Sequence, residues 1–174
     1  MFFILFYTIN MKDIEKVASI IFLSALILIN IWMVVTDAQP WFISSLNILF
    51  HEAGHWIFGF FGEFIQALGG TLGELLMPFV FVLYFKKTLS ISGQVFSWWW
   101  FSTALYDISI YIADARARVL PLIGGQDGHD WAYLLGELGL LNFDIVISQL
   151  FLILFLLVTV YMIFLLYHYI ITIK

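Results

Sequence analysis

The chain has 174 residues, of which 63% are hydrophobic and 20% aromatic, whereas only 11% are charged. A chain this apolar is not an ordinary soluble domain, and the sequence predicts an integral membrane protein surrounded by the lipid bilayer. The net charge of −5 comes without a basic patch that would neutralise phosphates, which excludes nucleic acid as a partner. No cysteine is present, so any metal must be held by imidazole and carboxylate groups.

Several uncharged runs are long enough to cross a membrane as helices, which takes about 20 residues. We expect an all-α, multi-pass (polytopic) membrane helical bundle with about five transmembrane helices, forming a single domain over residues 1–174. The expected crossings are residues 17–35, 42–61, 71–85, 95–113 and 145–173. Polar residues and proline at 36–40 end the first crossing. The glycine-rich stretch 62–70 is expected to form a re-entrant or tight connecting loop.

The second crossing contains the motif His-Glu-Ala-Gly-His at residues 51–55. On a helix, His51 and His55 project from one face a single turn apart, as two ligands of one zinc ion require. Glu52 lies beside them, where its carboxylate can take a proton from water and pass it to a leaving amine. The alternative is a hydrogen-bonded histidine pair, but ionisable groups in an apolar helix are costly to bury and typically serve a function. The sequence therefore predicts a zinc site with Glu52 as the general base.

Further polar residues lie on the helices expected around this motif. Ser44, Asn47 and Gly54 share the face of the two histidines, where they either admit water or let helices approach closely. Asp107 and Asp114 lie about two turns apart on one face of the fourth crossing. We expect Asp107 to orient a ligand histidine, and Asp114 to pair with one of the two arginines at positions 116 and 118.

A third metal ligand is expected because catalytic zinc usually has three protein ligands and one open position. The loop at residues 124–131 is the best source of it. Three candidates lie within four positions of that loop: Asp127, His129 and Asp130. Either aspartate is alternatively the cap of a helix that begins near Trp131. Glu74 and His168 are weaker candidates.

These motifs resemble those of the site-2 protease family of intramembrane zinc metalloproteases. Members of that family place HExxH in one membrane helix and a distant Leu-Asp-Gly motif, often preceded by Leu-Pro, near a later helix. This chain has HEAGH, then Leu-Pro at residues 120–121 and Asp-Gly at residues 127–128. The resemblance implies that Glu52 is the general base. The zinc ligands that it implies are His51, His55 and Asp127.

A second family of integral-membrane peptidases combines HExxH with a later Glu-x-x-Ala-Asp motif, which residues 110–114 resemble. Ile110 stands where that family has its glutamate ligand, so this resemblance ranks below the first.

We therefore expect a membrane-embedded zinc metalloendopeptidase that hydrolyses peptide bonds within or near the membrane, with a membrane protein or peptide as its substrate. The alternative is a non-catalytic accessory or assembly subunit that joins other membrane subunits and whose metal site is structural or silent. Cleavage that depends on Glu52 separates the two hypotheses.

Overall fold

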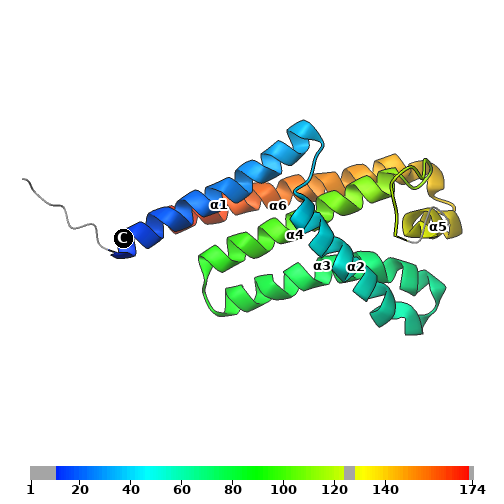
Figure 1. Ribbon diagram of the computed structural model, residues 1–174, viewed down its shortest axis with the longest axis horizontal. Helices are drawn as coiled ribbons and strands as arrows, with labels where there is room; N and C mark the ends of the chain where they lie inside the picture. Colours follow the sequence, from blue (N-terminus) through cyan, green and yellow to red (C-terminus); the bar gives the residue numbers. More distant parts are fainter. Residues whose placement is uncertain (1–10, 124–127, 173–174) are drawn as a thin grey trace, which may run out of the picture.

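The computed structural model describes residues 11–123 and 128–172, which are helical throughout apart from turns and short connections (Figure 1). This confirms the expected all-α class, and the described residues contain no strand. In chain order the elements are α1 (Met11–Thr36), α2 (Trp41–Phe58), η1 (Gly59–Phe61), α3 (Glu63–Lys87), α4 (Ile91–Ala113), α5 (Asp130–Glu137), η3 (Leu141–Phe143) and α6 (Asp144–Thr172).

Three segments of the described chain are long and apolar enough to cross a membrane: Ile14–Thr36, Glu63–Lys87 and Leu141–Thr172. They correspond to α1, to α3, and to η3 with α6. The helices α2 and α4, which we also expected to cross, are not among them. The reason lies in their composition, since α2 carries the HExxH motif and α4 carries serine, threonine and aspartate side chains.

The helices α1, α4 and α6 lie side by side along the long axis of the molecule (Figure 1). Side chains with almost no exposure form the core between them: Leu23, Trp99 and Met162. Within this core Asn30 of α1 donates hydrogen bonds to Ser102 of α4 at 2.8 Å and to Thr159 of α6 at 2.9 Å. The helix α3 packs along α4, and α5 lies at the end of the bundle where α3 begins and α4 ends (Figure 1).

The stretch 62–70, which we expected to be a loop, is helical from Glu63 onward. Its glycines allow α2 and α3 to cross closely instead of breaking the chain. A Cβ atom on Gly54 of α2 would overlap the backbone oxygen of Gly69, and a Cβ on Gly73 would overlap the backbone oxygen of Phe50. Because backbone atoms cannot move aside without separating the helices, only glycine permits this approach.

Candidate metal centre

The histidines of the HExxH motif lie on α2 beside its crossing with α3. Their ring centroids are 4.8 Å apart, as expected for side chains one helical turn apart. The ring of His51 fits against Gly70 of α3, where a Cβ atom would lie 2.5 Å from its Nε2 atom. The absence of a side chain at Gly70 therefore provides the space for the His51 ring.

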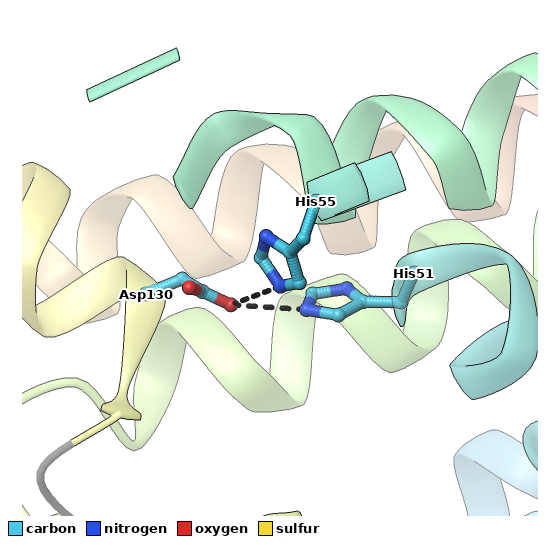
Figure 2. A group of neighbouring side chains, drawn as sticks. All are labelled: His51, His55 and Asp130. Carbon is cyan, nitrogen blue, oxygen red and sulfur yellow. Dashed lines mark hydrogen bonds and ion pairs between the residues drawn. The ribbon is translucent and has the colours of Figure 1, made fainter. Parts of the chain in front are cut away.

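The carboxylate of Asp130, the first residue of α5, lies against both imidazoles (Figure 2). Its Oδ2 atom is 3.0 Å from His51 Nε2 and 3.3 Å from His55 Nε2. These three residues form a group of potential metal ligands whose donor atoms all lie within 4.8 Å of one another. Residues 79 positions apart in the sequence thus meet at one point.

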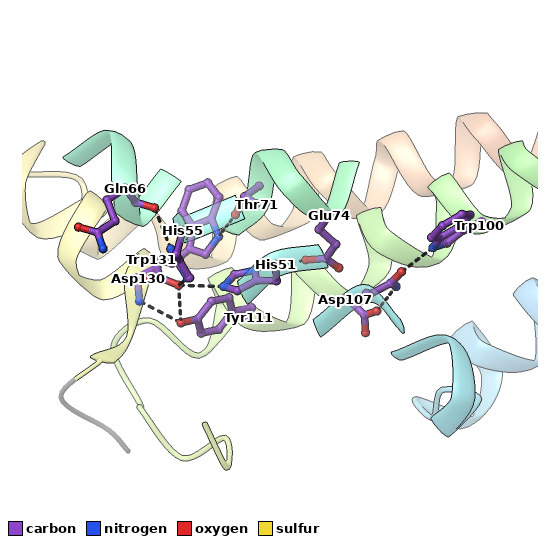
Figure 3. Close-up of polar contacts among 11 residues, drawn as sticks. His51, His55, Gln66, Thr71, Glu74, Trp100, Asp107, Tyr111, Asp130 and Trp131 are labelled. Carbon is purple, nitrogen blue, oxygen red and sulfur yellow. Dashed lines mark hydrogen bonds and ion pairs between the residues drawn. The ribbon is translucent and has the colours of Figure 1, made fainter. Parts of the chain in front are cut away.

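The opposite nitrogen of each ring faces an acceptor on α3 (Figure 3). His51 Nδ1 lies 3.5 Å from Glu74 Oε2, and His55 Nδ1 lies 2.8 Å from the backbone oxygen of Gln66. Acceptors at Nδ1 keep the proton on that nitrogen, so Nε2 is the atom that gives up its proton when a metal binds. Both Nε2 atoms are directed at the side of the site where Asp130 lies.

Tyr111 of α4 holds Asp130 in this position. Its hydroxyl donates to Asp130 Oδ2 at 3.2 Å and accepts the backbone N–H of Asp130 at 2.9 Å. Burial alone raises the pKa of Asp130, but the hydrogen bonds with His51 and His55 outweigh it and lower the pKa to about 2. The carboxylate is therefore ionised at neutral pH, as a metal ligand must be.

The donor set fits zinc. Two imidazole nitrogens and one carboxylate oxygen are typical of catalytic zinc sites, in which a fourth position stays open. Four ligands at about 2.0–2.2 Å in tetrahedral geometry lie about 3.3–3.6 Å from one another. The observed separations of 3.0 and 3.3 Å between Asp130 Oδ2 and the two nitrogens are close to that range.

The three residues open onto a cavity of about 870 Å³, within the range of about 300–1,000 Å³ usual for binding sites. Glu52 lines this cavity, and its carboxylate makes no hydrogen bond to another described residue. One wall is apolar and comes from residues 120–123, with Ile48 of α2 and Ile110 of α4. The cavity therefore combines a potential base, a potential metal site and an apolar wall.

His129 is not part of the metal group, although we counted it as a candidate ligand. It caps the N-terminus of α5 by accepting the Ala132 N–H at Nδ1, 3.3 Å away. Its ring stacks on Tyr111 at a centroid distance of 4.3 Å. Burial lowers the pKa of His129, so the ring is neutral and its Nδ1 can accept a hydrogen bond. Asp127, the ligand implied by the resemblance, lies outside the described residues.

The pairing that we expected between Asp114 and a neighbouring arginine is wrong. Asp114 pairs with neither neighbouring arginine and instead accepts the backbone N–H groups of Val119 and Leu120. Arg116 pairs with Asp144 at the start of α6, at 2.6 Å. His168 lies exposed near the C-terminal end of α6, far from α5 (Figure 1).

Asp107 does not contact either histidine ring. Its carboxylate accepts a hydrogen bond from Asn47 at 2.5 Å, and the carbonyl of Asn47 accepts one from Trp100 at 2.8 Å (Figure 3). The role that we expected for Asp107 at a ligand histidine is taken by Glu74. The sequence carries no local signal for the roles of Glu74, Tyr111 or the Gln66 carbonyl, because each depends on how helices cross.

Neither the scan against protein-family models nor the searches of curated proteins and of solved structures found a match for this chain. Within residues 11–123 and 128–172, the chain is all-helical with three helices long and apolar enough to cross a membrane, and His51, His55 and Asp130 form the one group of potential metal ligands.

Proposed function

We propose that this protein is a multi-pass, intramembrane zinc metalloprotease of the site-2 protease type, which hydrolyses peptide bonds within or near the membrane. The observation that carries the proposal is the convergence of Asp130 Oδ2 on the Nε2 atoms of His51 and His55. A coincidental HExxH sequence would have no reason to meet a carboxylate from a distant helix, with acceptors behind both rings.

Each residue of the site then has a defined task. His51, His55 and Asp130 bind the metal, while Glu74 and Tyr111 orient two of these ligands. Zinc at this site would supply Lewis acidity, which lowers the pKa of a water ligand and polarises the scissile carbonyl.

The proton is carried by Glu52, whose carboxylate is adjacent to the ligands and faces the cavity. It removes a proton from the water that attacks the peptide carbonyl and delivers that proton to the departing amide nitrogen. The carboxylate is regenerated when the amine leaves, so the base is ready for the next turnover. The apolar residues at 120–123 line the same cavity and can contact apolar side chains of the substrate.

The membrane setting rests on the exposed apolar side chains of the long helices. Leu28 of α1 is 63% exposed and Leu157 of α6 is 60% exposed, although both belong to helices able to cross a bilayer. Lipid is the solvent that such surfaces require. We include α2 and α4 in the membrane region as well, which gives about five crossings, with η1 as the turn between α2 and α3. The substrate is accordingly a membrane protein or a peptide at the membrane.

The test uses the purified full chain in detergent with one equivalent of zinc. Unfolded β-casein and a synthetic single-span peptide are incubated with it, and new termini are mapped by mass spectrometry. We expect Glu52→Gln to keep its zinc and to lose cleavage by about 10²–10⁴-fold. Glu137→Gln, the same change at an exposed position on α5, should cleave like wild type.

Zinc binding without any cleavage would contradict the protease proposal and favour the accessory-subunit alternative. That alternative also predicts that a Glu52→Ala variant keeps its cellular function and co-purifies with other membrane subunits. No zinc at any occupancy would contradict the metal site itself.

A further inference from the structure

The cavity beside the metal group is strongly acidic. Five of its lining residues carry carboxylates: Glu52, Glu63, Glu74, Asp107 and Asp130. No lysine or arginine is found among its described lining residues. A zinc ion at the site would offset only two of the negative charges that these five carboxylates can carry. A cavity with one sign of charge and low-dielectric walls concentrates guests of the opposite sign.

Two of the carboxylates are not accounted for by the hydrolytic chemistry. Glu74 uses Oε2 at His51, but its Oε1 is buried and has no hydrogen-bond partner among the described residues, and Glu74 as a whole is only 5% exposed. Asp107 has no cationic partner in the described part of the chain. Its neighbours are the neutral donors Asn47, Gln39 and Ser44.

Glu74 of α3 and Asp107 of α4 line the same cavity. In the view of Figure 3 the Glu74 side chain is drawn between those of His51 and Asp107. The unpaired Glu74 Oε1 is costly because it has lost its hydration, whereas Asp107 already accepts hydrogen bonds from neutral donors. A cationic group bound between these two carboxylates would remove that cost.

The lining of this cavity offers both kinds of contact that a long basic side chain needs. Asp107 precedes Tyr111 by one helical turn, about 6 Å along α4, and the Tyr111 ring lies 5.8 Å from the His51 ring. Ile48 of α2 and Ile110 of α4 line the same cavity. Lysine and arginine combine an apolar stem with a cationic head, so the isoleucines would contact the stem and the carboxylates the head.

We propose that Asp107 and Glu74 form a specificity pocket that accepts a lysine or arginine side chain of the substrate, close to the bond that is cut. This inference rests on the proposed protease function and defines its substrate class as polypeptides with a basic residue near the cleavage site. Asp107 is the specificity-determining residue, because Glu74 is also needed to orient His51.

Binding is tested first, without any requirement for cleavage. The zinc-loaded full chain is titrated with n-butylammonium, which reproduces a lysine side chain, and with n-butanol as the neutral control, by saturation-transfer NMR. We expect n-butylammonium to bind at least tenfold more tightly than n-butanol. Asp107→Asn, which keeps an acceptor for Asn47, should abolish this difference, whereas Asp37→Asn, outside the cavity, should preserve it.

Asp107→Glu is the second variant, because it retains the charge and should retain the preference for the cation even if Asp107→Asn folds poorly. Equal binding of the two probes by wild type would overturn the inference, and so would an unchanged preference in a folded Asp107→Asn variant.

Cleavage-site mapping on β-casein then separates this inference from the proposed function. We expect lysine or arginine to be enriched at one fixed position next to the cut, with the enrichment lost in Asp107→Asn while other sequences are still cleaved. Cleavage without such enrichment would overturn the specificity pocket and leave the protease proposal standing. Selective binding of n-butylammonium with no cleavage of any substrate would leave the cation pocket standing and overturn the protease proposal.

Discussion

Replacing Gly70 by alanine should remove zinc binding and leave the fold intact. The new Cβ atom would lie 2.5 Å from Nε2, 2.6 Å from Cε1 and 2.8 Å from Cδ2 of the His51 ring. The atoms that this Cβ would meet belong to the His51 side chain and not to backbone. The His51 ring can therefore rotate away without separating α2 from α3. The substitution therefore acts on the metal ligand more than on the fold.

The magnitude follows from these distances. Ordinary contact with a Cβ atom begins at 3.4 Å, so the His51 ring must move by about 0.6–0.9 Å. Metal–ligand distances tolerate only about 0.2 Å, and a displacement of this size removes His51 as a ligand. Changes in residues that support a metal ligand lower metal affinity by up to about 100-fold. Because Gly70→Ala would displace the proposed ligand itself, we expect zinc affinity to fall by at least that factor. Alanine also favours a helix over glycine by about 0.5–1 kcal/mol, so α3 itself is not weakened.

The assay is competition for zinc against a chromophoric chelator, with circular dichroism to confirm helix content. The matched control is Gly136→Ala on α5, where a Cβ atom would meet no other atom within 4 Å. That variant should bind zinc like wild type. Wild-type zinc affinity in a folded Gly70→Ala protein would refute the arrangement of His51 against α3.

The remaining predictions concern the supporting residues. Asp130→Ala should reduce zinc affinity by more than the roughly 10–100-fold expected for Glu74→Gln, both measured by chelator competition, because in the proposed site Asp130 is a ligand and Glu74 orients one; a larger loss in Glu74→Gln would contradict this order. His129→Ala should keep its zinc but destabilise the protein by about 1 kcal/mol through loss of the α5 cap, measured by denaturant unfolding in detergent, and a loss of zinc would instead make His129 a ligand. Arg116→Ala should lower the thermal midpoint, because Asp144 is left buried without its partner, with zinc content unchanged.

The HExxH motif was the part of the site that the sequence predicted best, because the relative position of its two histidines depends only on helical periodicity. His51 and His55 lie on one face of a continuous helix, as their spacing predicts. The position of the proposed third ligand could be narrowed from the sequence to a short loop, but not to one residue. Which side chain of that loop faces the histidines depends on Tyr111, which binds both the backbone and the carboxylate of Asp130. That contact joins two helices and leaves no mark on local sequence.

The glycine-rich stretch after α2 shows where local reasoning fails. Glycine disfavours helix by about 1 kcal/mol relative to alanine, so a pair at Gly69 and Gly70 predicts a break. In the folded protein the same residues let α3 approach α2 and make room for the His51 ring. The tertiary contact outweighs the local preference. Gly54 was recognisable on α2 as a residue that could let helices approach closely, but the sequence did not identify its partners on α3.

The most direct test of the metal centre is zinc K-edge X-ray absorption on the purified, zinc-loaded protein. The structure predicts one zinc per chain, with two imidazole nitrogens and a carboxylate oxygen at about 2.0–2.2 Å, and loss of the carboxylate contribution in Asp130→Ala. A spectrum with fewer than two imidazoles, or one that is unchanged by Asp130→Ala, would contradict the His51, His55 and Asp130 site.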